Sequence, residues 1–235
     1  MRRFEPARRL WTGWRRWFNP LRSANAALRG ALQRNAGHVR GRLLDVGCGG
    51  KPYADLFGQV DRYVGIDVLP SGGGQQDVYA SGLQLPFAAG VFDTVLSTEV
   101  LEHVPEPSQL IGEAYRVLRP GGCLVLTTPQ TWGLHQIPHD YYRYTPFGLR
   151  YLAEKNGFTV LRLEPTTGFG VTFCQRFCDV VFYAPDGRPN FTGLVGELVK
   201  VPLAMVQLLG AGFDKIIGQR GDTLDNLLIA RRHEA

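Results

Sequence analysis

The chain has 235 residues, 44% of them apolar, which suits a globular protein of one main domain and excludes collagen-like or disordered chains. Its formal net charge of +5 hides two opposite parts. Residues 1–42 contain eleven arginines and one acid, Glu5, and carry +10, whereas residues 43–235 carry −5. The basic leader and the mildly acidic body therefore need separate explanations.

The four cysteines form no C-x-x-C pair, and Cys174 and Cys178, which are four residues apart, have no His or carboxylate partners at metal-ligand spacing nearby. We therefore expect neither a disulfide framework nor a metal site. In the leader, tryptophans alternate with arginines, which does not indicate a secretory signal. The longest apolar stretch, residues 194–213, contains Glu197, Lys200 and Pro202 and is a poor candidate for a membrane-spanning helix. These features predict a cytoplasmic location.

Strand and helix signals alternate along most of the chain. The expected strands are 42–46, 63–66, 92–97, 123–127, 158–163 and 226–230. The expected helices are 21–35, 52–57, 108–118 and 146–156, followed by two apolar helices at 171–183 and 194–217. The alternation predicts an α/β fold with a mostly parallel sheet and helices on both faces. The two apolar helices form an insertion between the last two strands.

The first expected strand runs into a glycine turn, Gly47-Cys48-Gly49-Gly50, as strands that open nucleotide pockets do. The dinucleotide fingerprint requires a third glycine where this chain has Pro52, and Asp45 would repel a pyrophosphate. S-adenosylmethionine fits better, because its ammonium and sulfonium are positive and it has no phosphate. Asp67 ends the second strand, at a suitable distance for binding the two ribose hydroxyls. The alternative is that Asp45 and Asp67 only cap strand ends.

Six ordered motifs carry a family resemblance: Leu44-Asp45-Val46-Gly47-Cys48-Gly49, Gly65-Ile66-Asp67, Leu85-Pro86-Phe87, Phe92-Asp93-Thr94-Val95-Leu96-Ser97, Val100-Leu101-Glu102-His103-Val104 and Leu118-Arg119-Pro120-Gly121-Gly122. Over residues 40–165 the chain resembles class I S-adenosylmethionine-dependent methyltransferases of the small-molecule type. The resemblance implies a Rossmann-like, doubly wound seven-stranded sheet with an antiparallel last strand. Residues 18–22, 50–53 and 135–145 also resemble methyltransferases of surface-polysaccharide or lipid-linked glycan assembly.

The resemblance also implies a set of cofactor-binding residues: Asp45, Gly47, Cys48, Gly49, Asp67, Val68, Ser81, Gly82 and Thr98. Within it, Asp45 and the glycines would line the methionine end and Asp67 would hold the ribose. Two positions depart from the family pattern. Ser81 stands where the family often has an Asp beside the adenine, and Gly50-Lys51 replaces the third glycine of the turn. Backbone groups of Ser81 and Gly82 would then serve the adenine.

Methyl transfer from a sulfonium is an in-line displacement, so positioning supplies most of the catalysis and a base is needed only when the acceptor loses a proton. Candidate catalytic groups follow the fourth and fifth strands: His103, His139, Asp140 and Tyr142. We expect His139 to act as base or acceptor-positioning group, oriented by Asp140 or a tyrosine. The alternatives are that the tyrosines cap the cofactor, and that Glu102 and His103 orient loop backbone.

The predicted activity is methyl transfer from S-adenosylmethionine to a small or lipid-linked acceptor, with oxygen as the expected methylated atom. The alternatives are a quinone-type carbon methyltransferase, an RNA methyltransferase that uses the leader as a phosphate clamp, and a cofactor-binding regulatory subunit without turnover. Arginines mixed with tryptophans favour peripheral contact with an anionic membrane over nucleic acid. The rival interpretation is that leader and insertion pack together as a lid.

Three regions are predicted along the chain. Residues 1–40 form a basic, aromatic, helical leader, and residues 41–165 with 222–235 form the cofactor-binding core. Residues 166–221 form the helical apolar insertion, which would serve as a lid or face a membrane.

Overall fold

The computed structural model describes residues 21–68, 75–184, 188–218 and 221–234, so the first half of the basic leader lies outside the described residues. Seven strands form one sheet in the order β3-β2-β1-β4-β5-β7-β6. Their bounds are β1 (Arg42–Val46), β2 (Arg62–Asp67), β3 (Val78–Tyr79), β4 (Phe92–Thr98), β5 (Leu118–Pro129), β6 (Phe158–Pro165) and β7 (Asp225–Arg232). The strands from β3 to β5 pair in parallel, whereas β7 is antiparallel to both β5 and β6. The expected doubly wound sheet with an antiparallel last strand is confirmed.

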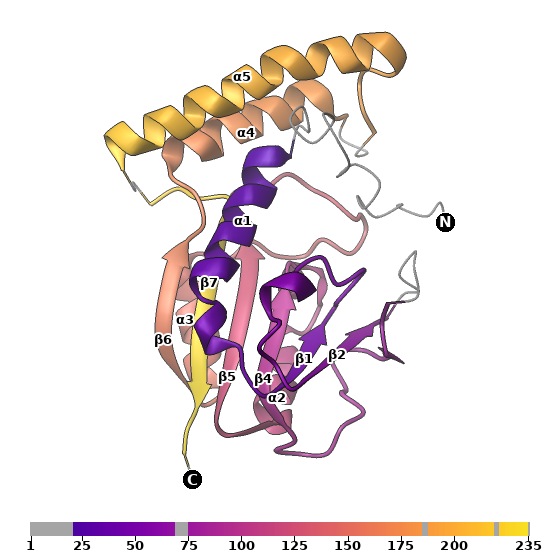
Figure 1. Ribbon diagram of the computed structural model, residues 1–235, viewed down its shortest axis with the longest axis vertical. Coiled ribbons are helices and arrows are strands. Elements are labelled where there is room, and N and C mark those ends of the chain that lie inside the picture. Colours follow the sequence, from indigo (N-terminus) through magenta and orange to yellow (C-terminus); the bar gives the residue numbers. More distant parts are fainter. Residues whose placement is uncertain (1–20, 69–74, 185–187, 219–220, 235) are drawn as a thin grey trace.

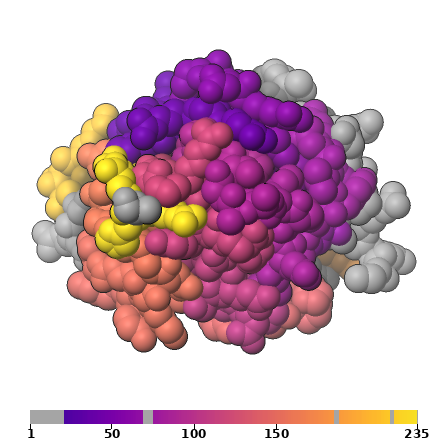
Figure 2. Space-filling model, turned by 90° about the horizontal axis from the view of Figure 1, so that it is seen from below, coloured from indigo at the N-terminus to yellow at the C-terminus, as the bar shows by residue number. Residues whose placement is uncertain are grey.

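Helices cover both faces of this sheet (Figure 1). Successive strand residues point to opposite faces, and the buried residues divide accordingly. Leu43 and Leu96 pack with α1 (Arg22–Arg34) on one face, whereas their neighbours Leu44 and Val95 pack with α2 (Pro107–Val117) and α3 (Pro146–Lys155) on the other. Seen from below, the end of β7 lies between the α1 region and the β6 region (Figure 2).

The insertion consists of α4 (Phe169–Phe182) and α5 (Gly193–Ile217), which lie side by side across one end of the sheet (Figure 1). The two helices touch at backbone level. A Cβ atom on Gly170 or on Gly210 would lie 2.7 Å from the carbonyl oxygen of the other, so this crossing requires glycine on both helices. Ser23 of α1 donates from its backbone N–H and its hydroxyl to Gln207 Oε1 of α5, at 3.1 and 2.9 Å. The insertion is thereby tied to the body.

Three elements differ from the sequence-based expectation. The helix expected at 52–57 is only a 3-10 turn, Ala54–Leu56, because proline and glycine residues bracket too short a segment. Strand β3 was not anticipated, since two residues carry no periodic pattern. Strand β5 begins at Leu118, so the Pro120-Gly121-Gly122 segment lies within it rather than after helix α2, which ends at Val117.

Candidate cofactor and acceptor site

The predicted site residues gather at the carboxyl ends of the parallel strands. Strand β1 pairs with β2 on one side and with β4 on the other, so Val46 lies between Ile66 and Ser97 in the register. The strand order reverses at this point. Open α/β sheets bind ligands in the crevice at such a switch point, which places the candidate site beside the glycine turn.

The glycine turn has a conformation that requires its glycines. Gly47 has φ +73°, and a Cβ there would lie 2.3 Å from Val100 Cγ2. The N–H groups of Gly47 and Cys48 both donate to the Ile66 carbonyl at 2.9 Å, which binds the turn to β2. Gly49 N–H donates to Asp67 Oδ2 at 2.9 Å, and the Cβ position of Gly49 faces open space. Asp67 therefore shapes the turn from the end of β2.

Asp45 is a buried carboxylate at the end of β1, with 3% of the residue exposed. Its Oδ2 accepts a hydrogen bond from the Tyr63 hydroxyl, whereas its Oδ1 has no hydrogen-bond partner. Burial raises the pKa of Asp45 to about 7, although the Tyr63 hydroxyl and the Lys51 ammonium oppose the shift. A buried acceptor atom without a donor is uncommon in proteins and fits a ligand cation. The Asp45 carboxylate and the open glycine turn therefore fit S-adenosylmethionine.

The remaining predicted cofactor residues lie around this turn. Cys48 is buried, and burial with the nearby Asp45 carboxylate raises its thiol pKa to about 12, so the thiol stays neutral. Gly82 packs so closely that a Cβ would lie 2.9 Å from Val46 Cγ1. Ser81 is exposed, and its hydroxyl accepts from the Leu83 N–H at 3.1 Å. Val68, which follows β2, is 64% exposed, and Thr98, the last residue of β4, is half-buried.

Lys51 and Asp77 belong to this site, although the sequence did not single them out. Lys51 Nζ lies 2.7 Å from Asp77 Oδ2, and the same oxygen accepts from the Gly65 N–H at 2.7 Å. Lys51 also lies over the Tyr63 ring, 5.1 Å from its centroid. Both residues lie in irregular segments, where no pattern predicts a contact across the sheet.

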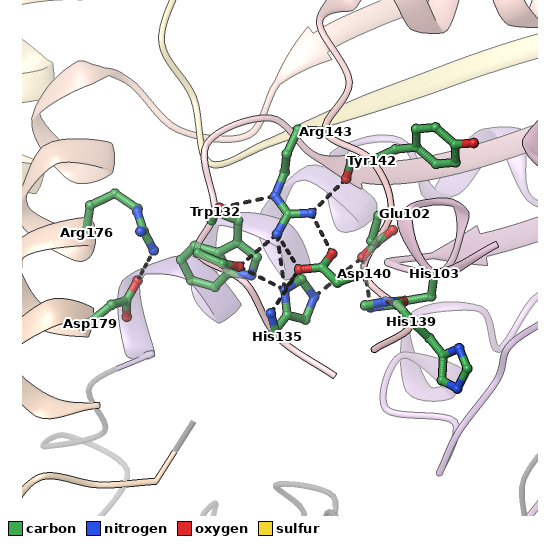
Figure 3. A network of polar contacts seen from close by, with 11 residues as sticks. Glu102, His103, Trp132, His135, His139, Asp140, Tyr142, Arg143, Arg176 and Asp179 are labelled. Carbon is green, nitrogen blue, oxygen red and sulfur yellow. Dashed lines mark hydrogen bonds and ion pairs between the residues drawn. The ribbon is translucent and has the colours of Figure 1, made fainter. Parts of the chain in front are cut away.

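The acceptor side is formed by the turn after β4 and the loop after β5. Glu102 and His103 end a short 3-10 turn, Leu101–His103. His103 Nδ1 lies 2.6 Å from the His139 carbonyl oxygen, and His135 Nδ1 lies 3.1 Å from the Gly133 carbonyl oxygen. The two imidazole rings meet edge to face, with centroids 4.7 Å apart. Two loops distant in sequence therefore converge on Glu102 (Figure 3).

Asp140 is held by Arg143 rather than by His139. Its carboxylate, 2% exposed, forms a two-pronged ion pair with Arg143 at 2.6 and 2.8 Å and accepts from the His135 N–H at 2.9 Å. Burial alone would raise the pKa of Asp140, but the Arg143 guanidinium lowers it below its ordinary value. The expectation that Asp140 orients His139 is wrong, because the guanidinium fork matches both carboxylate oxygens.

A tyrosine contacts His139 instead, which is the other partner expected from the sequence. His139 is exposed, and its Nδ1 lies 3.2 Å from the Tyr141 hydroxyl. In Figure 3 its ring extends away from the Glu102 cluster. The Tyr142 hydroxyl donates to the Pro105 carbonyl at 3.0 Å, so Tyr142 joins the two loops. His139 is the candidate base best able to meet a substrate from solvent.

Two more carboxyl groups, Glu99 and Asp225, lie behind this cluster and were not expected from the sequence. Glu99 follows β4 with φ +54°, an unusual conformation for a residue other than glycine. Burial raises the pKa of Glu99 well above its ordinary value, and the nearby Asp225 and Glu102 raise it further. Burial likewise raises the pKa of Asp225 to about 7. No sequence pattern connects the end of β4 with the start of β7.

A separate cavity of about 470 Å³ lies between α1, α4 and α5. It is lined by Ser23, Thr167, Gln207 and Asp214 among others, and by none of the predicted site residues. It lies away from the glycine turn, so we do not assign the cofactor to it.

The seven-stranded sheet with its antiparallel last strand is the fold of class I S-adenosylmethionine-dependent methyltransferases. Residues 44–126 match the family described as a methyltransferase domain. An uncharacterised methyltransferase of Mycobacterium leprae is 41% identical over 98 residues, covering 36% of each chain. The ubiquinone biosynthesis O-methyltransferase of Aromatoleum aromaticum is 31% identical over 125 residues, covering 47% of this chain and 53% of its own. The matched segment thus covers about half, or less, of the length of these relatives.

Solved structures show the same fold at low sequence identity. An S-adenosylmethionine-dependent methyltransferase from Mesorhizobium loti is 16% identical with a TM-score of 0.56, covering 89% of this chain and all of its own. A [4+2]-cyclase is 20% identical with a TM-score of 0.58, covering 89% and 82% of the two chains. The fold therefore accommodates more than one chemistry, and the reaction has to be argued from the site.

Proposed function

We propose that the protein transfers a methyl group from S-adenosylmethionine to a hydroxyl oxygen of a small or lipid-linked acceptor. One observation supports the proposal. The Asp45 carboxylate, with its buried and unpartnered oxygen, lies at the same end of the sheet as the histidine-rich loop after β5, namely the carboxyl ends of the parallel strands. The cradle suits a cationic cofactor, and the exposed His139 suits an acceptor that must lose a proton.

The relative named as a ubiquinone biosynthesis O-methyltransferase supports oxygen as the methylated atom. The quinone-type carbon methyltransferase remains the second candidate, because the acceptor side lies beside the apolar insertion. The contact is made by Arg176 of α4, which lies against Trp132 at 5.9 Å from its ring centroid (Figure 3). Aromatic and apolar groups near the acceptor loop suit either a quinone or a lipid-linked sugar.

In the proposed reaction the protein binds and orients the cofactor and the acceptor, and it removes one proton from the acceptor. The cofactor supplies a methyl group already activated on a sulfonium. Asp45 would bind the ammonium and Asp67 the ribose hydroxyls, while Asp67 fixes the Gly49 turn. Gly47 would let the backbone approach the cofactor closely. His139 would accept the proton of the acceptor hydroxyl, and the hydroxyl oxygen would take the methyl group in exchange for that proton.

The acceptor class can be tested with the protein and methyl-labelled cofactor. The labelled cofactor is incubated with separate lipid, glycan, RNA and protein fractions of a bacterial lysate, and label transfer is measured. We expect transfer into the lipid-linked or small-glycan fraction, released by chemistry that cleaves methyl ethers. Transfer into RNA, or tight cofactor binding without transfer into any fraction, would contradict the proposal.

Replacing His139 with Ala is expected to reduce turnover about 100-fold, a typical loss when a positioned base is removed. Cofactor affinity should change less than about twofold, because His139 lies outside the Asp45 cradle. Turnover and cofactor binding are measured separately, the latter by calorimetry. His233→Ala is the matched control, since His233 is exposed beside Thr159 at the far end of β7. Unchanged turnover in His139→Ala would remove the catalytic role.

We also propose that the insertion binds an anionic membrane surface. Helix α5 is long and apolar enough to cross a membrane by length and composition, and 22% of the tested segment is buried. One face of α5 carries exposed apolar side chains at helical spacing: Leu194, Leu198, Val201, Met205 and Leu208. On α4, Phe173, Phe177 and Val180 are exposed as well. An apolar face of this size, in a chain whose first 20 residues combine arginines with tryptophans, suits an interfacial site.

The double substitution Leu198→Glu with Met205→Glu is expected to reduce liposome binding at least tenfold. Both side chains are more than half exposed, so the fold should tolerate the change, whereas two charges on the apolar face would have to enter the interface. Flotation with vesicles containing anionic lipid measures the bound fraction. Phe147→Glu on α3, where Phe147 is 82% exposed, is the matched control. Equal binding by the three proteins would contradict a docking role of this face.

A further inference from the structure

Glu102, His103 and His135 form a compact cluster at the acceptor side of the site. Their ligand atoms all lie within 4.8 Å of one another. The Glu102 side chain is 0% exposed, and neither of its carboxylate oxygens has a hydrogen-bond partner. His103 Nε2 is also buried without a hydrogen-bond partner. Figure 3 shows both imidazole rings beside this carboxylate.

The hydrogen bonds of the two rings determine which nitrogen faces Glu102. His103 Nδ1 contacts the His139 carbonyl, and His135 Nδ1 contacts the Gly133 carbonyl. A carbonyl oxygen only accepts, so His103 Nδ1 is the donor; His135 Nδ1 donates to its nearer neighbour, the Gly133 carbonyl at 3.1 Å, rather than accepting from Arg143 Nη2 at 3.5 Å. Each neutral ring then carries a lone pair on Nε2. Both Nε2 atoms face Glu102 Oε1, at 3.5 and 3.8 Å. With both rings neutral, three acceptor atoms therefore face one another, which is unfavourable unless a metal ion, or a proton on an imidazole, lies between them.

We propose that these three residues bind one divalent transition-metal ion of the Mn²⁺ to Zn²⁺ series. Two imidazoles with one carboxylate and open positions form a donor set used by such ions, whereas Mg²⁺ and Ca²⁺ prefer oxygen alone. A histidine ligand commonly donates its second N–H to a carbonyl, as both rings do here. Bonds of about 2.0–2.2 Å place neighbouring ligand atoms about 3–3.5 Å apart, so small side-chain movements suffice.

Metal binding itself is independent of methyl transfer, but its role rests on the proposed function. The His103 and His135 side chains are 13% and 27% exposed, so one side of the cluster opens toward solvent. An acceptor hydroxyl oxygen would bind the ion there, and the ion would lower the pKa of that hydroxyl. The proton would pass through solvent at the open side of the cluster to His139, whose exposed ring belongs to the same loop. The oxygen would then attack the methyl carbon with no change in oxidation state.

The test measures binding of Mn²⁺ and Zn²⁺ to the full-length protein after chelator treatment, without cofactor or acceptor. Calorimetry with Zn²⁺ and electron paramagnetic resonance with Mn²⁺ give the stoichiometry, and thermal unfolding gives an independent readout. We expect one ion per chain and an increase in Tm on metal addition. Absence of binding would overturn the proposal and leave a shared proton as the occupant of the cluster.

Glu102→Gln and His135→Gln are each expected to weaken metal binding at least tenfold and to abolish the metal-dependent increase in Tm. Glu102→Gln removes a buried charge, so its Tm in chelator should equal or exceed that of the wild-type protein, which shows that it folds. His139→Gln is the matched control from the same loop, because its ring points away from the cluster; it should bind metal normally. Equal affinity in Glu102→Gln would overturn the site. Metal binding without methyl transfer would contradict only the proposed function.

Discussion

Asp45→Asn is expected to weaken S-adenosylmethionine binding about 100-fold, because a charge-assisted contact with the ammonium contributes about 1.5–3 kcal/mol. The same substitution should stabilise the protein without ligand at pH 8. The Asp45 carboxylate is buried, with one oxygen unpartnered, and the amide carries no charge to bury. Loss of binding together with a gain in stability distinguishes a functional carboxylate from a structural one.

The stabilities of the wild-type protein and of Asp45→Asn should depend differently on pH, because the pKa of Asp45 is raised in the folded protein. The folded protein holds the Asp45 proton up to about pH 7, whereas the unfolded chain releases it near its ordinary value of 3.8. The resulting stability is present below pH 3.8 and is lost as the pH rises through 7. Asp45→Asn should therefore lose less stability than the wild type between pH 5 and pH 8, by about 2–4 kcal/mol. Cofactor affinity of the wild type should rise over the same interval.

Calorimetry for cofactor binding and urea unfolding at several pH values measure both effects. Asp61→Asn is the matched control, because Asp61 is exposed in the loop before β2 and should affect neither quantity. If Asp45→Asn bound the cofactor as tightly as the wild-type protein, Asp45 would be only a strand-end residue and the cradle would be assigned wrongly.

Arg143→Met is expected to reduce the free energy of unfolding by about 2–3 kcal/mol at pH 7, since it leaves the Asp140 carboxylate buried without its cation. Arg143 also donates to the carbonyl oxygens of Trp132 and Gly133, at 3.1 and 2.8 Å, so the whole loop after β5 loses its anchor. Turnover should fall with it, because His139 belongs to that loop. Arg143→Lys should recover only part of the stability, since an ammonium lacks the planar fork.

The pH dependence of this second effect has the opposite sign. The pKa of Asp140 is lowered in the folded protein, so the ion pair stabilises it above pH 3.8 and the benefit is lost as the pH falls through the folded-state value. The stability difference between wild type and Arg143→Met should therefore shrink in acid. Arg150→Met is the matched control: its 3.3 Å pair with Glu154 is exposed and should contribute less than about 0.5 kcal/mol. Equal losses in both variants would contradict the anchoring role.

The sequence predicted the positions of those candidate residues that depend on one strand and the turn that follows it. Asp45, Gly47 and Asp67 lie where a strand, a glycine turn and a second strand place them, and the parallel sheet follows from the alternation of elements. Contacts between loops that are distant in the sequence could not be predicted. Glu102 and His135 meet only because β4 and β5 are neighbours in the sheet.

The choice of partner for Asp140 shows a second limit of sequence reasoning. Adjacency in the sequence suggested His139 as the partner, but in the structure Asp140 pairs with Arg143, three residues later. A side chain selects the partner with the best geometry and charge, and adjacent residues in a loop commonly point in different directions. Strand β3 and the segment 52–57 were misjudged for a simpler reason, since elements of two or three residues carry no periodicity.

The position of β7 has a consequence for the order in which the protein folds. Strand β7 lies between β5 and β6, yet it follows the whole of α4 and α5 in the chain. During synthesis β6 therefore has no strand to pair with, and β5 lacks its partner on one side, while the two apolar helices are made. The nascent protein therefore passes through a stage in which the apolar helices α4 and α5 have been synthesised but the sheet is incomplete. The exposed apolar side chains of the insertion are therefore made before the sheet that supports them is complete.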